Sequence, residues 1–113
     1  MPEKYAILSG SNKAVIGHIT ILDNTGVIEL NPQADEGDIP FEFRRSFRNG
    51  EYSIDRERVF KWIITRIPPQ YRQDIGDVLR ELGLSEYNEI EMFKAYRGRS
   101  VRDDYYIEMV EDE

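Results

Sequence analysis

The side chains that could serve in catalysis do not form a catalytic set. His18 is the single histidine, and its neighbours Gly17 and Ile19 offer it no acid–base partner. We therefore expect His18 to be a solvent-facing strand residue and not a general base or a metal ligand. The chain has no cysteine, which excludes thiol catalysis, disulfides and zinc–cysteine sites.

Two short segments have the composition, but not the spacing, of ligand-binding loops. Residues 35–38 carry the carboxylates of Asp35, Glu36 and Asp38, without the repeated oxygen ligands and closing glutamate of an EF-hand. Residues 9–13 lack the second glycine and the following helix of a phosphate-binding loop. We predict a solvated acidic loop and a hairpin turn, with no catalytic residue, no cofactor and no metal.

A tryptophan between arginines favours binding over catalysis. On a helical wheel at about 100° per residue, Trp62 falls outside the apolar arc of residues 59–67, on the side shared with Arg58 and Arg66. Tryptophan and arginine are enriched among residues that anchor protein interfaces. The alternative is a core position that leaves only the indole N–H near water. Both interpretations stay open, with the core position ahead.

Three arginines in six residues form a second basic feature. Arg97, Arg99 and Arg102 follow a predicted helix and directly precede two aspartates. Guanidinium groups fit phosphate oxygens, so an anion site is one interpretation. The other, which we favour, is that these cations complement the end of the helix and neutralise the following acids. We take Trp62, Arg58, Arg66 and Arg99 as the candidate partner-binding residues.

The elements that must position these residues begin as a meander of strands. Residues 5–8, 15–22 and 27–30 are rich in β-branched side chains and are separated by turn sequences, which predicts antiparallel neighbours. Pro, Gly and Asp in residues 31–40 predict a loop. Alternating phenylalanine and charged side chains over residues 41–44 predict a fourth strand.

The second half of the chain has the period of helices. Capping residues and stop signals bound three predicted helices, which are 56–67 after Asp55, 69–82 before Gly83, and 86–97 between Ser85 and Gly98. Residues 105–107 can rejoin the sheet as an edge strand. We expect one α+β domain over residues 1–108, with an antiparallel sheet of three to five strands packed against three helices.

The charge of the chain is concentrated at its C-terminal end. The 113 residues hold 22 acidic and 15 basic side chains, and six of the acids lie in residues 103–113 without a base. A near-neutral body with an acidic tail over 109–113 would repel phosphate backbones, which argues against direct nucleic-acid binding. No apolar run approaches ~18 residues and no secretory signal pattern opens the chain, so we expect a cytoplasmic protein without membrane contacts.

Residues 59–107 carry an ordered set of short motifs. An aromatic pair in 59–62 precedes an isoleucine–proline stop in 66–69, an arginine-led helix ends in Leu-Gly-Leu at 82–84, and Gly-Arg-Ser at 98–100 leads to a closing strand. In this order the motifs resemble the small N-terminal subdomain of HipA-like serine/threonine kinases. The strand at 15–19 is similar to the family's opening strand.

The resemblance stops before any kinase catalytic loop or nucleotide-binding loop. It implies a stand-alone subdomain similar to the HipS-like proteins of bacterial toxin–antitoxin operons, which bind and restrain a separate kinase chain. The function it implies is a non-catalytic regulatory subunit of a HipA-like kinase, with no small-molecule substrate. The alternative is a phage or mobile-element accessory protein that binds an unrelated host protein.

Overall fold

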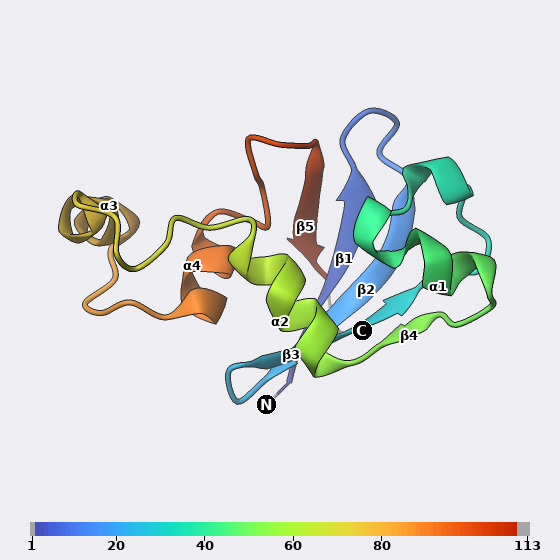
Figure 1. Ribbon diagram of the computed structural model, residues 1–113, viewed down its shortest axis with the longest axis horizontal. Helices are drawn as coiled ribbons and strands as arrows, with labels where there is room; N and C mark the ends of the chain where they lie inside the picture. The colour runs from blue at the N-terminus through green and yellow to red at the C-terminus, as the bar shows by residue number, and fades with distance from the viewer. Residues whose placement is uncertain (1, 111–113) are drawn as a thin grey trace.

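A computed structural model describes residues 2–110 of the chain. Five strands form one antiparallel sheet in the order β4-β3-β2-β1-β5 (Figure 1). In chain order the strands are β1 (Glu3–Ser9), β2 (Val15–Leu22), β3 (Thr25–Leu30), β4 (Ser53–Ile54) and β5 (Tyr105–Met109). The α+β class that the sequence predicts is confirmed.

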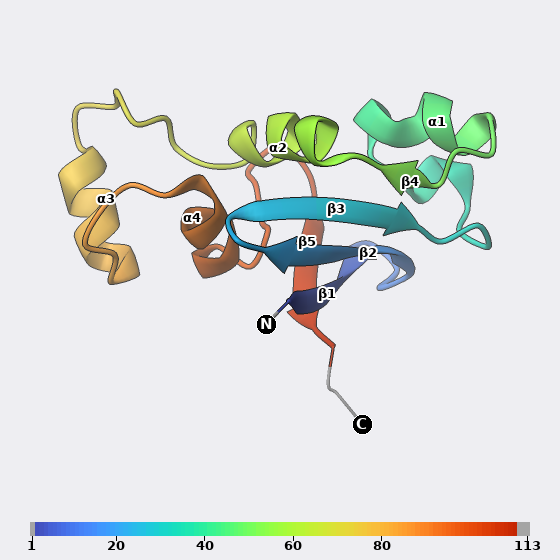
Figure 2. The same cartoon turned by 90° about the horizontal axis from the view of Figure 1, so that it is seen from below.

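Within the described residues, four α-helices accompany the sheet, together with two 3-10 turns. They are α1 (Arg44–Arg48), α2 (Arg56–Ile64), α3 (Ile75–Leu82) and α4 (Glu89–Ala95), with η1 (Glu36–Asp38) and η2 (Phe41–Phe43) before α1. Helices α1 and α2 lie over one face of the sheet, α4 packs beside its end, and α3 stands beyond α4 (Figure 2). None of the helices in the described part of the chain is long and apolar enough to cross a bilayer.

The hairpin between β2 and β3 fixes the register of the sheet. Its two turn residues, Asp23 and Asn24, have φ angles of 51° and 62°, a left-handed conformation that Asp and Asn tolerate better than most residues. Leu22 consequently pairs with Thr25 across the turn. This register places Ile19 and Ile21 of β2 and Ile28 of β3 on the face that the helices cover.

The core lies between that face and the helices. Tyr5, Ile19, Ile28 and Ile54 stand opposite one another on four neighbouring strands, and each is at most 8% exposed. Side chains of α2 and α4 cover this row, including Val59, Trp62, Ile63, Ile90 and Phe93. Each large apolar side chain buried there contributes about 1.5–3 kcal/mol to folding.

The predicted strand at residues 41–44 is wrong. These residues form η2 and the first residue of α1, because the Phe43 N–H binds the carbonyl of Pro40 at 2.8 Å and the Arg44 Nε–H binds that of Ile39 at 2.8 Å. Phe43 is buried while Phe41 is 80% exposed. The alternation of phenylalanine and charged residues over 41–44 therefore belongs to a 3-10 turn in which only Phe43 is buried, and not to a strand.

The three predicted long helices exist, but most of their boundaries shift. Asp55 caps α2 as expected, through its carboxylate and the Arg58 N–H, but α2 ends at Ile64 and not at residue 67. Helix α3 begins at Ile75, after an irregular segment, and ends at Gly83 as predicted. Helix α4 begins after Asn88, because the Asn88 side chain accepts the Glu91 N–H, and Ser85 is not its cap.

The C-terminal boundary also moves. Met109 belongs to β5, and the Val110 N–H donates to the carbonyl of Lys4 at 3.0 Å. The sheet thus continues into the segment 109–113 predicted as an acidic tail. The remaining tail residues, 111–113, lie outside the described part of the chain.

Candidate functional site

Trp62 is a core residue in this structure. Its side chain is 2% exposed and lies between the rings of Phe43 and Phe93, at centroid distances of 5.6 and 5.8 Å. Helix α2 packs against η2 and α4, so its buried arc is rotated about the helix axis toward Trp62, relative to the arc of apolar residues on the wheel. Phe60 and Ile64, which the wheel places in the core, are 38% and 45% exposed. Trp62 is therefore not available as a surface anchor.

Arg66 ties the end of α2 to the loop before β5. Its Nη1 and Nη2 atoms each lie 2.7 Å from a carboxylate oxygen of Asp103, and its Nε–H donates to the Gly98 carbonyl at 2.8 Å. The guanidinium also lies over the Trp62 ring, 4.6 Å from its centroid. Arg66 is 7% exposed. This predicted partner-binding residue therefore has a structural role and is not accessible to a partner.

Arg66 also sets the ionisation of its partner. Burial raises the pKa of Asp103, but the hydrogen bonds and the charge of Arg66 outweigh burial and hold that pKa below its ordinary value. Asp103 remains a carboxylate at neutral pH and accepts the Tyr105 N–H at 3.1 Å as well. The pair is thus a fixed, charge-assisted link between α2 and the start of β5.

Arg58 has a comparable structural position on the other side of α2. Its Nη1 donates to Ser46 Oγ at 2.7 Å and its Nη2 to the Glu42 carbonyl at 3.2 Å. The guanidinium lies 5.9 Å from the centroid of the Phe43 ring. Arg58 is half-buried and holds α1 and η2 against α2.

Arg99 is the predicted site residue that is exposed. It stands in a tight loop after α4, in which Arg97 and Gly98 have φ angles of 56° and 71°. The Arg97 carbonyl accepts the Ile107 N–H at 2.8 Å, which anchors the loop against β5. The Arg99 guanidinium lies over the Tyr106 ring, 4.7 Å from its centroid.

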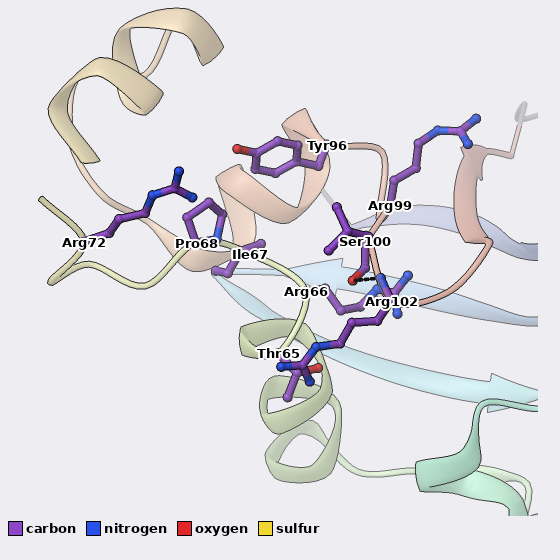
Figure 3. Close-up of a pocket in the computed structure, with 10 residues that line it drawn as sticks. Thr65, Arg66, Ile67, Pro68, Arg72, Tyr96, Arg99, Ser100 and Arg102 are labelled. Carbon is purple, nitrogen blue, oxygen red and sulfur yellow. Dashed lines mark hydrogen bonds between the residues drawn. The ribbon is translucent and has the colours of Figure 1, made fainter. Parts of the chain in front are cut away.

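The loop with Arg99 borders a hollow of about 460 Å³, here called the arginine pocket (Figure 3). The pocket is formed by two parts of the chain that are distant in sequence: residues 65–72 after α2, and residues 96–102, which run from the end of α4 into the loop before β5. Its lining residues are Thr65, Arg66, Ile67, Pro68, Arg72, Tyr96, Arg99, Ser100, Val101 and Arg102. Four of them are arginines and none is acidic.

The four arginines contribute unequally to the charge of the pocket. Arg66 is neutralised by Asp103, and Arg72 pairs with Asp74 through a hydrogen bond of 3.1 Å. Within residues 2–110, Arg99 and Arg102 form no ion pair. The loop that borders the pocket therefore carries two guanidinium groups that have no ion-pair partner within residues 2–110, on a chain whose net charge is −7.

The arginine side chains at the pocket do not converge on one point. In Figure 3 the Arg102 side chain extends across to Thr65, whereas the Arg72 guanidinium and the Tyr96 hydroxyl lie near Pro68. Arg99 extends away from these residues. The arrangement suits an elongated anionic ligand better than a single small anion.

His18 lies far from a catalytic arrangement. It pairs across strands with Glu29, which in turn pairs with Ser53, but the Ser53 hydroxyl donates to Glu29 and not to an imidazole nitrogen. Burial lowers the pKa of His18, and the charge of Lys4 lowers it further. Among the described residues, no group of three or more His, Asp or Glu side chains could hold a metal ion.

The sequence indicated one side of the arginine pocket and missed the other. The cluster at 97–102 was visible as a local run of arginines. The place of Arg72 was not visible, because only the fold brings the segment after α2 beside residues 96–102. In comparisons with known proteins, no protein family, curated protein or solved structure gives a significant match to this chain.

Proposed function

We propose that this chain is a non-catalytic binding subunit that regulates a separate HipA-like serine/threonine kinase. The observation that carries the binding role is the arginine pocket, an open hollow bordered by two guanidinium groups that have no ion-pair partner within residues 2–110, on a chain whose net charge is −7. The class of the partner rests on the resemblance of residues 59–107 to the N-terminal subdomain of these kinases.

The way the pocket is built supports recognition of a partner. Arg66 and Asp103 join the segment after α2 to the loop before β5 through a buried, bidentate ion pair. The Gly98 loop is closed by the hydrogen bond from the Ile107 N–H to the Arg97 carbonyl. A surface held in place before binding loses less conformational entropy when the complex forms.

Exposed apolar side chains add a second contact area on α2. Phe60 lines a smaller hollow of about 300 Å³ with Gly26 and Ile90, and Ile64 is exposed on the same helix. In the proposed complex these residues take the anchoring role that the sequence suggested for Trp62. Aromatic residues are enriched in the centres of protein interfaces.

Co-expression with a HipA-like kinase chain from the same organism tests the proposal. We expect the two chains to co-elute in size-exclusion chromatography with the mass of a stoichiometric complex, and kinase autophosphorylation to change when the subunit is added. Replacing Phe60 by serine should weaken the complex, whereas Arg45→Ala on α1 should not. Separate elution of the two wild-type chains, with unchanged kinase activity, would contradict the proposal.

The alternative, an accessory protein that binds an unrelated host protein, has a different outcome in the same experiment. In that case the subunit would elute alone in the presence of the kinase. It would instead capture another protein through a surface that Phe60→Ser or Arg102→Ala disrupts.

A further inference from the structure

We infer that the arginine pocket binds an acidic peptide segment of a partner protein. The inference deepens the proposed function, because it names the chemistry that the partner would present to this chain. The acidic groups on that segment can be carboxylates or phosphates, since both accept the paired N–H groups of a guanidinium.

Charge is the first argument. Arg99 and Arg102 have no carboxylate partner in residues 2–110, and no acidic residue lines the pocket. Ser100 Oγ accepts the Arg102 N–H at 3.2 Å, which leaves the hydroxyl hydrogen of Ser100 available to an acceptor. Two guanidinium groups and a hydroxyl donor on one short loop complement at least two anionic groups spaced along a chain.

The apolar part of the lining is the second argument, and it favours a peptide over an isolated anion. Ile67, Pro68 and the Tyr96 ring line the pocket, and Val101 stands fully exposed at its border. A free phosphate would use none of this surface. A peptide can place an apolar side chain against Pro68 and Tyr96 while its acidic neighbours reach the arginines.

The surroundings of the pocket disfavour a nucleic acid. Two of the pocket arginines are already paired, Arg66 with Asp103 and Arg72 with Asp74. A nucleic-acid backbone carries a charge at every nucleotide and would continue past the pocket over these carboxylates, on a chain whose net charge is −7, whereas a short peptide can confine its acidic groups to Arg99 and Arg102. The volume of about 460 Å³ accommodates a short peptide segment, in the range of typical ligand pockets.

Binding requires a local rearrangement of side chains and not of the fold. Arg99 must leave the Tyr106 ring to reach a ligand in the pocket, and such an exposed cation–π contact is a weak interaction. Arg102 already extends across the pocket toward Thr65 (Figure 3). The loop itself remains fixed by Arg66 and by the Arg97–Ile107 hydrogen bond.

Nuclear magnetic resonance titrations of the full chain test this inference. The probes are a seven-residue peptide of glutamates around a central leucine, the same peptide with glutamines, a version with phosphoserines, and single-stranded oligothymidylate. The variants are the double substitution Arg99→Ala/Arg102→Ala and, as a control with one charge removed at the other end of the molecule, Arg45→Ala. All titrations use about 0.15 M salt to suppress non-specific attraction.

We expect both acidic peptides to shift the resonances of residues 96–102, and the glutamine peptide to shift none. The double variant should bind them about 10- to 100-fold more weakly, from the loss of charge-assisted hydrogen bonds, whereas Arg45→Ala should bind as the wild type does. The tighter of the two acidic peptides then identifies carboxylate or phosphate as the preferred group.

Three results would overturn the inference. They are equal binding of the glutamine and glutamate peptides, equal binding by the double variant and the wild type, and tighter binding of oligothymidylate than of either acidic peptide. Failure here is distinguishable from failure of the proposed function. Co-elution with the kinase without peptide binding rejects only the peptide inference, whereas loss of both rejects the proposed function as well.

Discussion

Replacing Asp103 by alanine should destabilise the fold, because it leaves the buried guanidinium of Arg66 without its carboxylate. The Arg66 side chain is 3% exposed and would keep only the carbonyls of Gly98, at 2.8 Å, and Tyr105, at 3.3 Å. The substitution also removes the acceptor of the Tyr105 N–H. Asp103→Asn, which keeps one acceptor oxygen, should be milder.

The size of the effect follows from the burial of the pair. Breaking a buried ion pair by removing one partner costs about 3–5 kcal/mol. The Asp103 side chain is 31% exposed, so water can reach part of the vacated site. We therefore expect a loss of about 2–3 kcal/mol in the free energy of unfolding, a large fraction of the ~5–15 kcal/mol typical of a domain.

Urea unfolding followed by circular dichroism measures this loss, and Trp62 provides a second signal as the single tryptophan. The coupling between the partners comes from a double-mutant cycle with Arg66→Met, which keeps an apolar side chain on the Trp62 ring. The control is Asp77→Ala, because Asp77 pairs with Arg80 on the exposed surface of α3, where an ion pair contributes about 0–1 kcal/mol. An Asp103→Ala variant as stable as the control would refute the structural role of the pair.

The same pair predicts how stability depends on pH. The native pKa of Asp103 lies below its unfolded value, so its contribution is complete above about pH 4 and is lost as the pH falls through the lower native pKa. Wild type should therefore lose more stability than Asp103→Asn as the pH falls below about 4. If the free energy of unfolding falls equally with pH in the two proteins, this assignment is contradicted.

Three further substitutions separate the fold from the pocket. Trp62→Ala should lower the free energy of unfolding by about 3–5 kcal/mol, measured in urea, because it opens a cavity between Phe43 and Phe93. Gly98→Ala should lower the melting temperature, since a Cβ at φ 71° would also lie 3.0 Å from the Ile107 side chain, whereas Gly76→Ala on α3 has open space. Arg102→Ala should change the free energy of unfolding by no more than about 0.5 kcal/mol, and a larger loss would show that this arginine belongs to the fold.

Local signals predicted the fold well where a pattern depends on neighbouring residues. The meander of β1 to β3 follows from alternating isoleucines and from a turn at Asp23-Asn24 that accepts positive φ angles. Gly83 ended α3 as predicted, because its φ of 74° closes the last helical turn. These features need only the chemistry of a few adjacent residues.

Features that depend on tertiary contacts could not be predicted in this way. Trp62 lies outside the apolar arc of α2 and yet is buried, because η2 and α4 approach that helix from two sides. Arg66 looked like a surface cation, and its partner Asp103 is 37 residues further along the chain. No pattern within α2 identifies such a partner. Arg66, which forms a structural ion pair, therefore resembled an interface residue.

Which arginines of the arginine pocket form ion pairs could also not be predicted, because tertiary contacts decide the pairing. Its basic loop was visible in the sequence, where the nearby aspartates suggested local neutralisation. In the structure Asp103 pairs with Arg66. Arg99 and Arg102 form no ion pair within residues 2–110. A count of neighbouring charges therefore missed which of the arginines remain available to a ligand.

The affinity of this chain for a HipA-like kinase chain from the same organism tests the proposed function most directly. Isothermal titration calorimetry should be carried out with the wild type, with Arg99→Ala/Arg102→Ala, and with Arg45→Ala. We predict a stoichiometric complex that the double substitution weakens at least ~10-fold and that Arg45→Ala leaves unchanged. No heat of binding with the wild type, or equal affinities for all three proteins, would contradict the account of the arginine pocket as the partner-binding surface.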